Sequence, residues 1–135
     1  MLLRLIALFL LFPLIIGFTS SSNSTFIFEF SSSTASSDVL IHAAVSSLEQ
    51  SGFRQVGSCT GTRCSNTGVG LQYGNHPIWV EVSSPSPMQL QFAFEQLHGG
   101  CGTGNPEVTG AKDVMTRVRA ALESRFGLAI VDDTH

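Results

Sequence analysis

The chain has 135 residues, a formal net charge of −3, 13% charged residues and 43% hydrophobic residues. This composition excludes a charge-driven disordered chain, and the length suits one domain. Lysine and arginine together number only 7, which is too few for a basic patch that neutralises several phosphates, so nucleic-acid binding is not expected.

The N-terminal segment is predicted to direct the chain out of the cytosol. A single positive charge, Arg4, interrupts an apolar start, and the run Leu5–Phe18 then contains no polar side chain. A membrane span needs about 20 apolar residues, so this run is short for a span and fits the apolar region of a signal peptide. The chain is therefore expected to be exported, either to the periplasm or into the medium.

The end of this segment offers a cleavage site. Ser20 and Ser22 are small residues that fit the −3 and −1 positions of such a site. The sequence thus predicts a leader over residues 1–22 and a single domain over residues 23–135. The alternative is an uncleaved anchor formed by residues 1–18, which is the only segment expected to contact a membrane.

The first half of the domain predicts two strands and a helix. After a serine-rich linker at residues 19–24, apolar and polar residues alternate over Thr25–Phe30, as in a strand with one apolar face. Apolar residues at helical spacing predict a helix over Asp38–Gln50, with Ser37 or Asp38 as its cap and a stop at the following glycine. A short strand is expected over Phe53–Ser58.

The second half adds more strands and a second helix. Alternating apolar residues predict strands over Val69–Tyr73, Ile78–Val82 and Met88–Glu95, the first two forming a hairpin. A helix follows, beginning between Asn105 and Lys112 and ending at Gly127. The last expected strand is Leu128–Val131.

The resulting order of elements, β-α-β-β-β-β-α-β, predicts an α+β fold. Each helix has one apolar stripe, and each strand with a single apolar face needs one covering layer. We expect a two-layer sandwich, with a mostly antiparallel sheet and both helices on one face. The plan is ferredoxin-like with an extra hairpin, an architectural analogy that implies no activity.

The 3 cysteines are the main candidates for chemistry. In an oxidising compartment, Cys59 and Cys64 are close enough in sequence to form a disulfide, and a bridge from Cys101 to one of them is the alternative. Either arrangement leaves one cysteine over. A competing interpretation combines Cys59, Cys64, His98 and Cys101 as zinc ligands or as a thiol-active group. No Asp or Asn that would orient His98 beside Cys101 can be identified, so no enzyme is predicted.

One face of the sheet is the candidate binding surface. If the apolar residues of Ile78–Val82 face the helices, Trp79 faces away from them. The same alternation places polar residues around it, so the predicted protein-binding face consists of Gln72, Trp79, Glu81, Gln89, Gln91 and Glu95. The alternative is that Trp79 packs beneath a loop or the segment after the leader.

These observations favour a small, exported, non-enzymatic protein of the cell envelope or the secreted space. It is expected to need no cofactor and to bind another protein, whose identity the sequence does not give. The alternative is a metal- or thiol-active domain that uses the cysteines and His98.

Overall fold

A computed structural model describes residues 20–30, 35–56, 68–99, 107–126 and 130–134. The elements follow the predicted order, with the bounds β1 Ser20–Phe30, α2 Ser37–Gln50, β2 Phe53–Gln55, β3 Val69–Tyr73, β4 Ile78–Ser83, β5 Gln89–His98, α3 Ala111–Phe126 and β6 Ile130–Thr134. Of the predicted leader over residues 1–22, residues 1–19 lie outside the described residues. Within the described ranges, no helix is long and apolar enough to cross a membrane.

The strands form one 6-stranded sheet in the order β2-β3-β4-β5-β1-β6, and every neighbouring pair is antiparallel. Because β5 and β6 both run antiparallel to β1, they are parallel to each other. Since α3 connects them, they form a split β-α-β unit with β1 inserted between its strands. The strands β2 to β5 form a meander, which supplies the extra hairpin of the ferredoxin-like plan.

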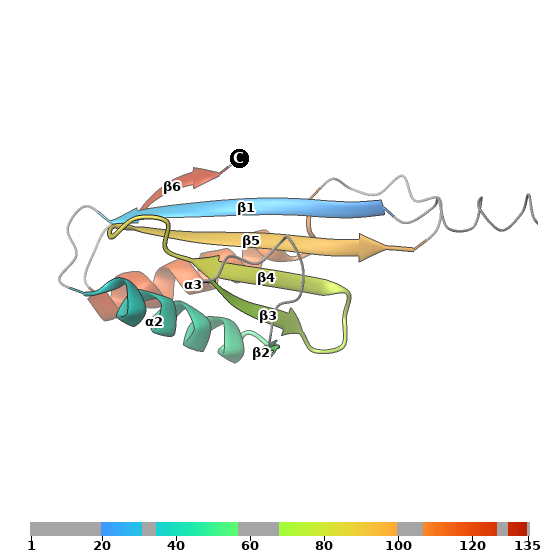
Figure 1. Ribbon diagram of the computed structural model, residues 1–135, viewed down its shortest axis with the longest axis horizontal. Helices are drawn as coiled ribbons and strands as arrows, with labels where there is room; N and C mark the ends of the chain where they lie inside the picture. Colours follow the sequence, from blue (N-terminus) through green and yellow to red (C-terminus); the bar gives the residue numbers. More distant parts are fainter. Residues whose placement is uncertain (1–19, 31–34, 57–67, 100–106, 127–129, 135) are drawn as a thin grey trace, which may run out of the picture.

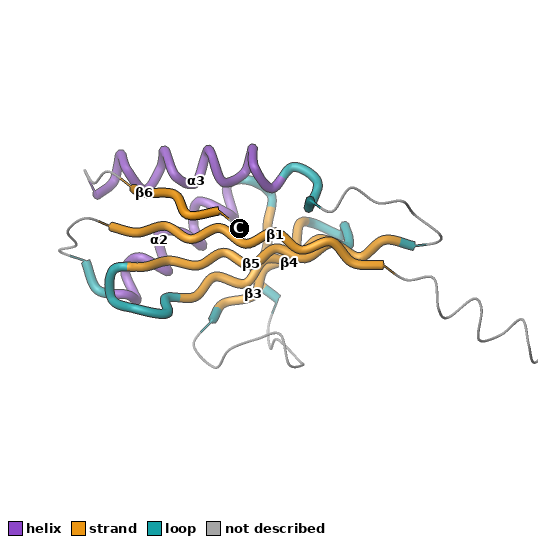
Figure 2. The backbone as a smooth tube through the Cα atoms, turned by 90° about the horizontal axis from the view of Figure 1, so that it is seen from above, coloured by secondary structure: helices purple, strands orange, loops and turns teal. Residues whose placement is uncertain are grey.

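The molecule has two layers, as expected. Both helices lie together on one side of the sheet (Figure 1), and α2 passes behind the strands when the sheet is seen from above (Figure 2). The core fills the space between the layers. Its fully buried side chains from the strands and helices include Phe28, Phe92, Phe94, Leu40, Leu48, Leu71, Leu90, Leu122, Val80, Val82 and Val118. The α+β sandwich is thus confirmed.

The start of β1 differs from the expectation. Residues Ser20–Ser24, expected as a linker, belong to the strand and pair with the last residues of β5. Their pairing depends on backbone hydrogen bonds to β5, which extends to His98 instead of ending near Glu95. Alternation of apolar and polar residues does not reveal this part of the strand, because its side chains are all polar.

Candidate functional site

The outer face of the sheet, which is the side turned away from the helices, holds the residues predicted to bind a partner. Along each strand, the residues that alternate with the core point to this face. The registers align Gln72 with Trp79, and Trp79 with Glu95. Continuing across the sheet, Arg54 of β2 pairs with Gln72, and Asn23 of β1 pairs with Glu95. We call this line of residues, Arg54-Gln72-Trp79-Glu95-Asn23, the central row.

A second row lies beside the central row. Glu81 stands between Gly70 on β3 and Ala93 on β5. The carboxylate of Glu81 lies over the backbone of Gly68, where a Cβ atom would collide with it. The absence of a side chain at Gly68 therefore leaves room for the carboxylate of Glu81.

The remaining predicted residues lie further along β5. Gln91 pairs with Ile27 and Ser83, and Gln89 pairs with Glu29. The Gln89 Nε2 atom donates a hydrogen bond of 2.9 Å to Glu29 Oε1. All the residues predicted for the binding face thus lie on one side of the sheet and are partly exposed.

Hydrogen bonds fix the β2 end of the central row. Gln72 Nε2 donates to the backbone oxygen of His76 at 3.0 Å, and Gln72 Oε1 accepts from Arg54 Nη2 at 3.4 Å. Arg54 Nε also donates to the backbone oxygen of Gly74 at 3.2 Å. The guanidinium of Arg54 therefore joins β2 to the β3–β4 turn and orients the amide beside Trp79.

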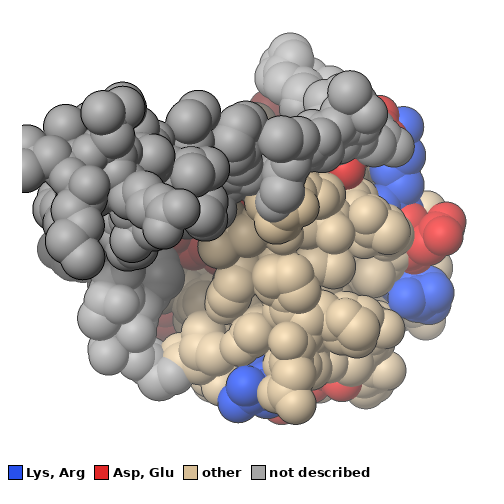
Figure 3. Space-filling model, turned by 90° about the vertical axis from the view of Figure 1, so that its right-hand side faces the viewer, with Lys and Arg blue, Asp and Glu red and all other residues tan. Residues whose placement is uncertain are grey.

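The charges on this face are mostly negative among the described residues. Glu29, Glu81 and Glu95 contribute carboxylates, whereas Arg54 contributes a guanidinium at the β2 edge. The end of the molecule next to the β3–β4 turn is mostly uncharged at its centre, with charged side chains at its margin (Figure 3). A ligand of the outer face would thus meet one indole ring surrounded by amides and carboxylates.

The second predicted group, Cys59, Cys64, His98 and Cys101, is described only in part. The three cysteines lie outside the described residues, and so does the predicted disulfide. His98 is at the end of β5, on the side of the sheet opposite Trp79, and its Nε2 atom lies 2.8 Å from Ser22 Oγ. No group of three metal-ligating side chains occurs within the part of the chain that the structure describes.

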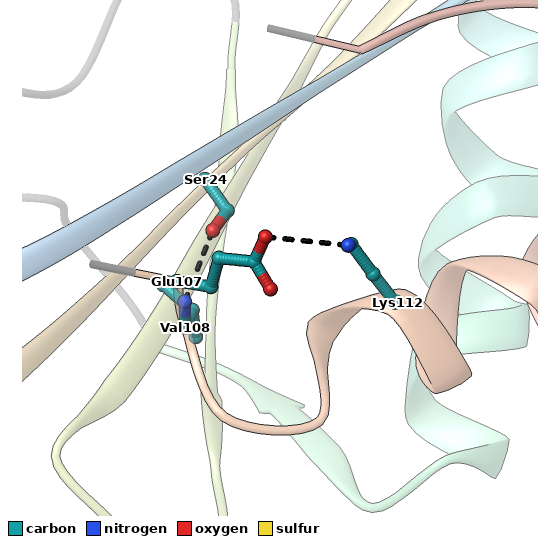
Figure 4. Close-up of polar contacts among 4 residues, drawn as sticks. All are labelled: Ser24, Glu107, Val108 and Lys112. Atoms are coloured by element: carbon teal, nitrogen blue, oxygen red, sulfur yellow. Dashed lines mark hydrogen bonds and ion pairs between the residues drawn. The ribbon is translucent and has the colours of Figure 1, made fainter. Parts of the chain in front are cut away.

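Polar contacts that the sequence did not predict join β1 and β5 to the segment before α3, and this segment to α3 itself. Ser24 Oγ accepts a hydrogen bond of 3.0 Å from the backbone N–H of Val108, and Glu107 forms an ion pair of 3.2 Å with Lys112 (Figure 4). Gln96 Oε1 accepts from the N–H of Thr109 at 2.9 Å. The hydrogen bonds of Ser24 and Gln96 attach the segment before α3 to the sheet, and the ion pair joins this segment to α3. No pattern in the sequence marks these contacts, because serines occupy positions 20, 21, 22 and 24 without alternation.

Comparison with known proteins yields no relative, since no family model, no curated protein and no solved structure matches the chain.

Proposed function

We propose that this protein is a small, exported, non-enzymatic component of the cell envelope or the secreted space, and that it binds another protein through the outer face. The observation that supports this proposal most is the central row. It places Trp79 in the middle of a rigid antiparallel sheet, with Gln72 on one side and Glu95 on the other.

The chemistry of the row suits a protein surface. A tryptophan offers a large apolar area with few rotatable bonds, and such residues dominate the binding energy of many protein interfaces. The neighbouring amide and carboxylate groups supply directional hydrogen bonds. Because strands hold these side chains and Arg54 orients the Gln72 amide, little conformational entropy is lost when a partner binds.

The negative charge of the outer face favours a partner of opposite charge. Three carboxylates, those of Glu29, Glu81 and Glu95, share the face with a guanidinium at its edge. A partner segment that carries lysine or arginine complements this charge, and a cation over the indole ring of Trp79 adds a cation–π interaction. We therefore propose a basic protein segment as the occupant.

The test begins by cross-linking the full chain in the cells that make it and identifying the attached protein. The affinity of the purified partner is then measured for the wild type and for the Trp79→Ala variant. We expect Trp79→Ala to weaken binding by about 2 kcal/mol or more, which is roughly 30-fold in Kd. Val39→Ala is the control, because Val39 is 42% exposed on α2, away from this face.

The charge of the partner is tested with a second pair of variants. Glu95→Gln is expected to weaken binding and to reduce its dependence on salt, whereas Asp113→Asn, on the exposed side of α3, should leave both unchanged. A folded Trp79→Ala variant that binds the partner as tightly as the wild type would contradict the proposal. Three titratable thiols together with bound zinc in the purified protein would favour the metal- or thiol-active alternative.

A further inference from the structure

The first residues of β1 contact the far end of β5. Ser20 pairs with His98, Ser21 with Leu97, and Ser22 with Gln96. The side chain of Ser22 is 4% exposed, and its hydroxyl lies 2.8 Å from the Nε2 atom of His98. These serines are therefore part of the folded sheet.

The contact between Ser22 and His98 satisfies two polar groups at once. A hydroxyl can donate to a bare ring nitrogen or accept from a protonated one, so the pair is satisfied in either tautomer of the histidine. Without the hydroxyl, the ring nitrogen of His98 loses this partner. Two positions further along β1, the hydroxyl of Ser24 accepts a hydrogen bond from the backbone N–H of Val108. The polar start of β1 thus fastens the end of β5 and the segment before α3.

From these contacts, we infer that the functional chain retains Ser20–Ser22 and that any removal of the leader takes place before Ser20. The cleavage itself rests on the proposed export. It would be hydrolysis by a leader peptidase, in which water adds across one peptide bond and leaves a carboxylate on the leader and an ammonium group on the mature chain. The inference differs from the expected cut after Ser22, for which Ser20 and Ser22 are the small residues at the −3 and −1 positions.

A cut after Ser22 would remove part of the sheet. It would deprive Gln96, Leu97 and His98 of their β1 neighbours and His98 of its hydroxyl partner. It would also place the new ammonium group at Asn23, within the paired region. A cut before Ser20 leaves all of these pairs intact and places the charge at the end of the strand.

The first test is the intact mass and N-terminal sequence of the protein that cells produce from the full-length gene. We expect a chain that begins at or before Ser20. A product that keeps its full length also retains the three serines and supports the inference, although it contradicts the removal of the leader. A product that begins at any residue after Ser20 overturns the inference. None of these outcomes depends on the partner-binding assay, so failure of the proposed function is recognised separately.

The second test compares two variants of the full chain by thermal unfolding. Ser22→Ala should lower the Tm by roughly 4–8 °C, because it removes the buried partner of His98. Ser21→Ala, at an exposed position of the same strand, is the matched control and should melt within about 2 °C of the wild type. Equal Tm values for the two variants would overturn the role given to Ser22.

Discussion

Phenylalanine rings from three strands of the sheet contact one another in the core. Phe28 and Phe92 have ring centroids 5.2 Å apart, and Phe26 meets Phe94 edge to face at 5.7 Å. Phe94 also contacts Phe53 of β2 at 6.2 Å. Offset and edge-to-face pairs add to the stabilisation that burial of the rings provides. These contacts therefore link β1, β5 and β2 beneath the helices.

Removing one of these rings is expected to destabilise the whole domain. Phe92 is 0% exposed, so Phe92→Ala should lower the free energy of unfolding by about 3–5 kcal/mol through lost burial and a residual cavity. Denaturant unfolding measures the loss. Met88→Ala, at a position 41% exposed, should change stability by less than about 0.5 kcal/mol. Similar losses in both variants would contradict the assigned core.

Two glycines with positive φ differ in their surroundings, which gives a second prediction. Gly52 has φ +100, and a Cβ there would meet Tyr73 Cε2 at 2.8 Å, whereas Gly74 has φ +53 and a nearest neighbour at 3.9 Å. Both alanine variants meet backbone strain, but only Gly52→Ala adds a collision. We expect Gly52→Ala to lower the free energy of unfolding by about 1 kcal/mol more than Gly74→Ala. Equal losses in chemical denaturation would count against the contact with Tyr73.

At the scale of elements, the N-cap of α2 lies one residue before the first of its two expected positions. The N-cap is Ser36, whose hydroxyl accepts a hydrogen bond of 3.4 Å from the backbone N–H of Val39. The sequence offers Ser36, Ser37 and Asp38 in succession, and each has a side chain able to cap a helix. Only the extended backbone at Ser36, with ψ 162, selects among them. The expectation of Ser37 or Asp38 was therefore wrong by a position.

Removing this cap should weaken α2 measurably. Ser36→Ala is expected to lower the free energy of unfolding by about 0.5–1 kcal/mol, at the low end for caps because the bond is long and exposed. Ser46→Ala, on the exposed side of the same helix, should leave stability unchanged or raise it slightly, because alanine favours helix. If urea unfolding shows no difference between the two variants, another residue supplies the cap.

Alternation along the strands predicted the segments that form the sheet and, with the short turn between them, the pairing of β3 with β4, but not the other pairings. The patterns at Val69–Tyr73 and Ile78–Val82 correspond closely to β3 and β4, because each of these strands buries one face. The same parity placed Trp79 on the outer face. It could not reveal Asn23 and Arg54, which complete the central row, because β2 is only 3 residues long and the start of β1 is polar. Their positions depend on the register between distant strands, which local patterns do not determine.

At the scale of the whole molecule, β1 joins the two parts of the sheet. It pairs along its length with β5 and, from Phe26 to Phe30, also with β6. The meander β2 to β5 lies on one side of β1, and β6 lies on the other. Loss of β1 would therefore separate β6 from the other strands and uncover the phenylalanines of β5.

This arrangement predicts an uneven pattern of hydrogen exchange. The amides of Phe26–Phe30 lie between two strands and should exchange most slowly, near the limit set by global unfolding. The amides of Phe53–Gln55, in the edge strand β2, should exchange faster because opening β2 breaks only its pairing with β3. Exchange followed by mass spectrometry or NMR tests this order. Equal protection of both segments would contradict the central place of β1.

The position of β1 also determines when the polypeptide can acquire its structure. Phe28 pairs with Leu90 and with Asp132, so β1 finds its second neighbour only after the distant strand β6 has also been synthesised. Such distant pairings slow folding, because a long loop must close before they form. Until β6 has emerged, β1 lacks this neighbour, and a chain whose sheet is still incomplete can be threaded through a translocation channel, as the proposed export would require.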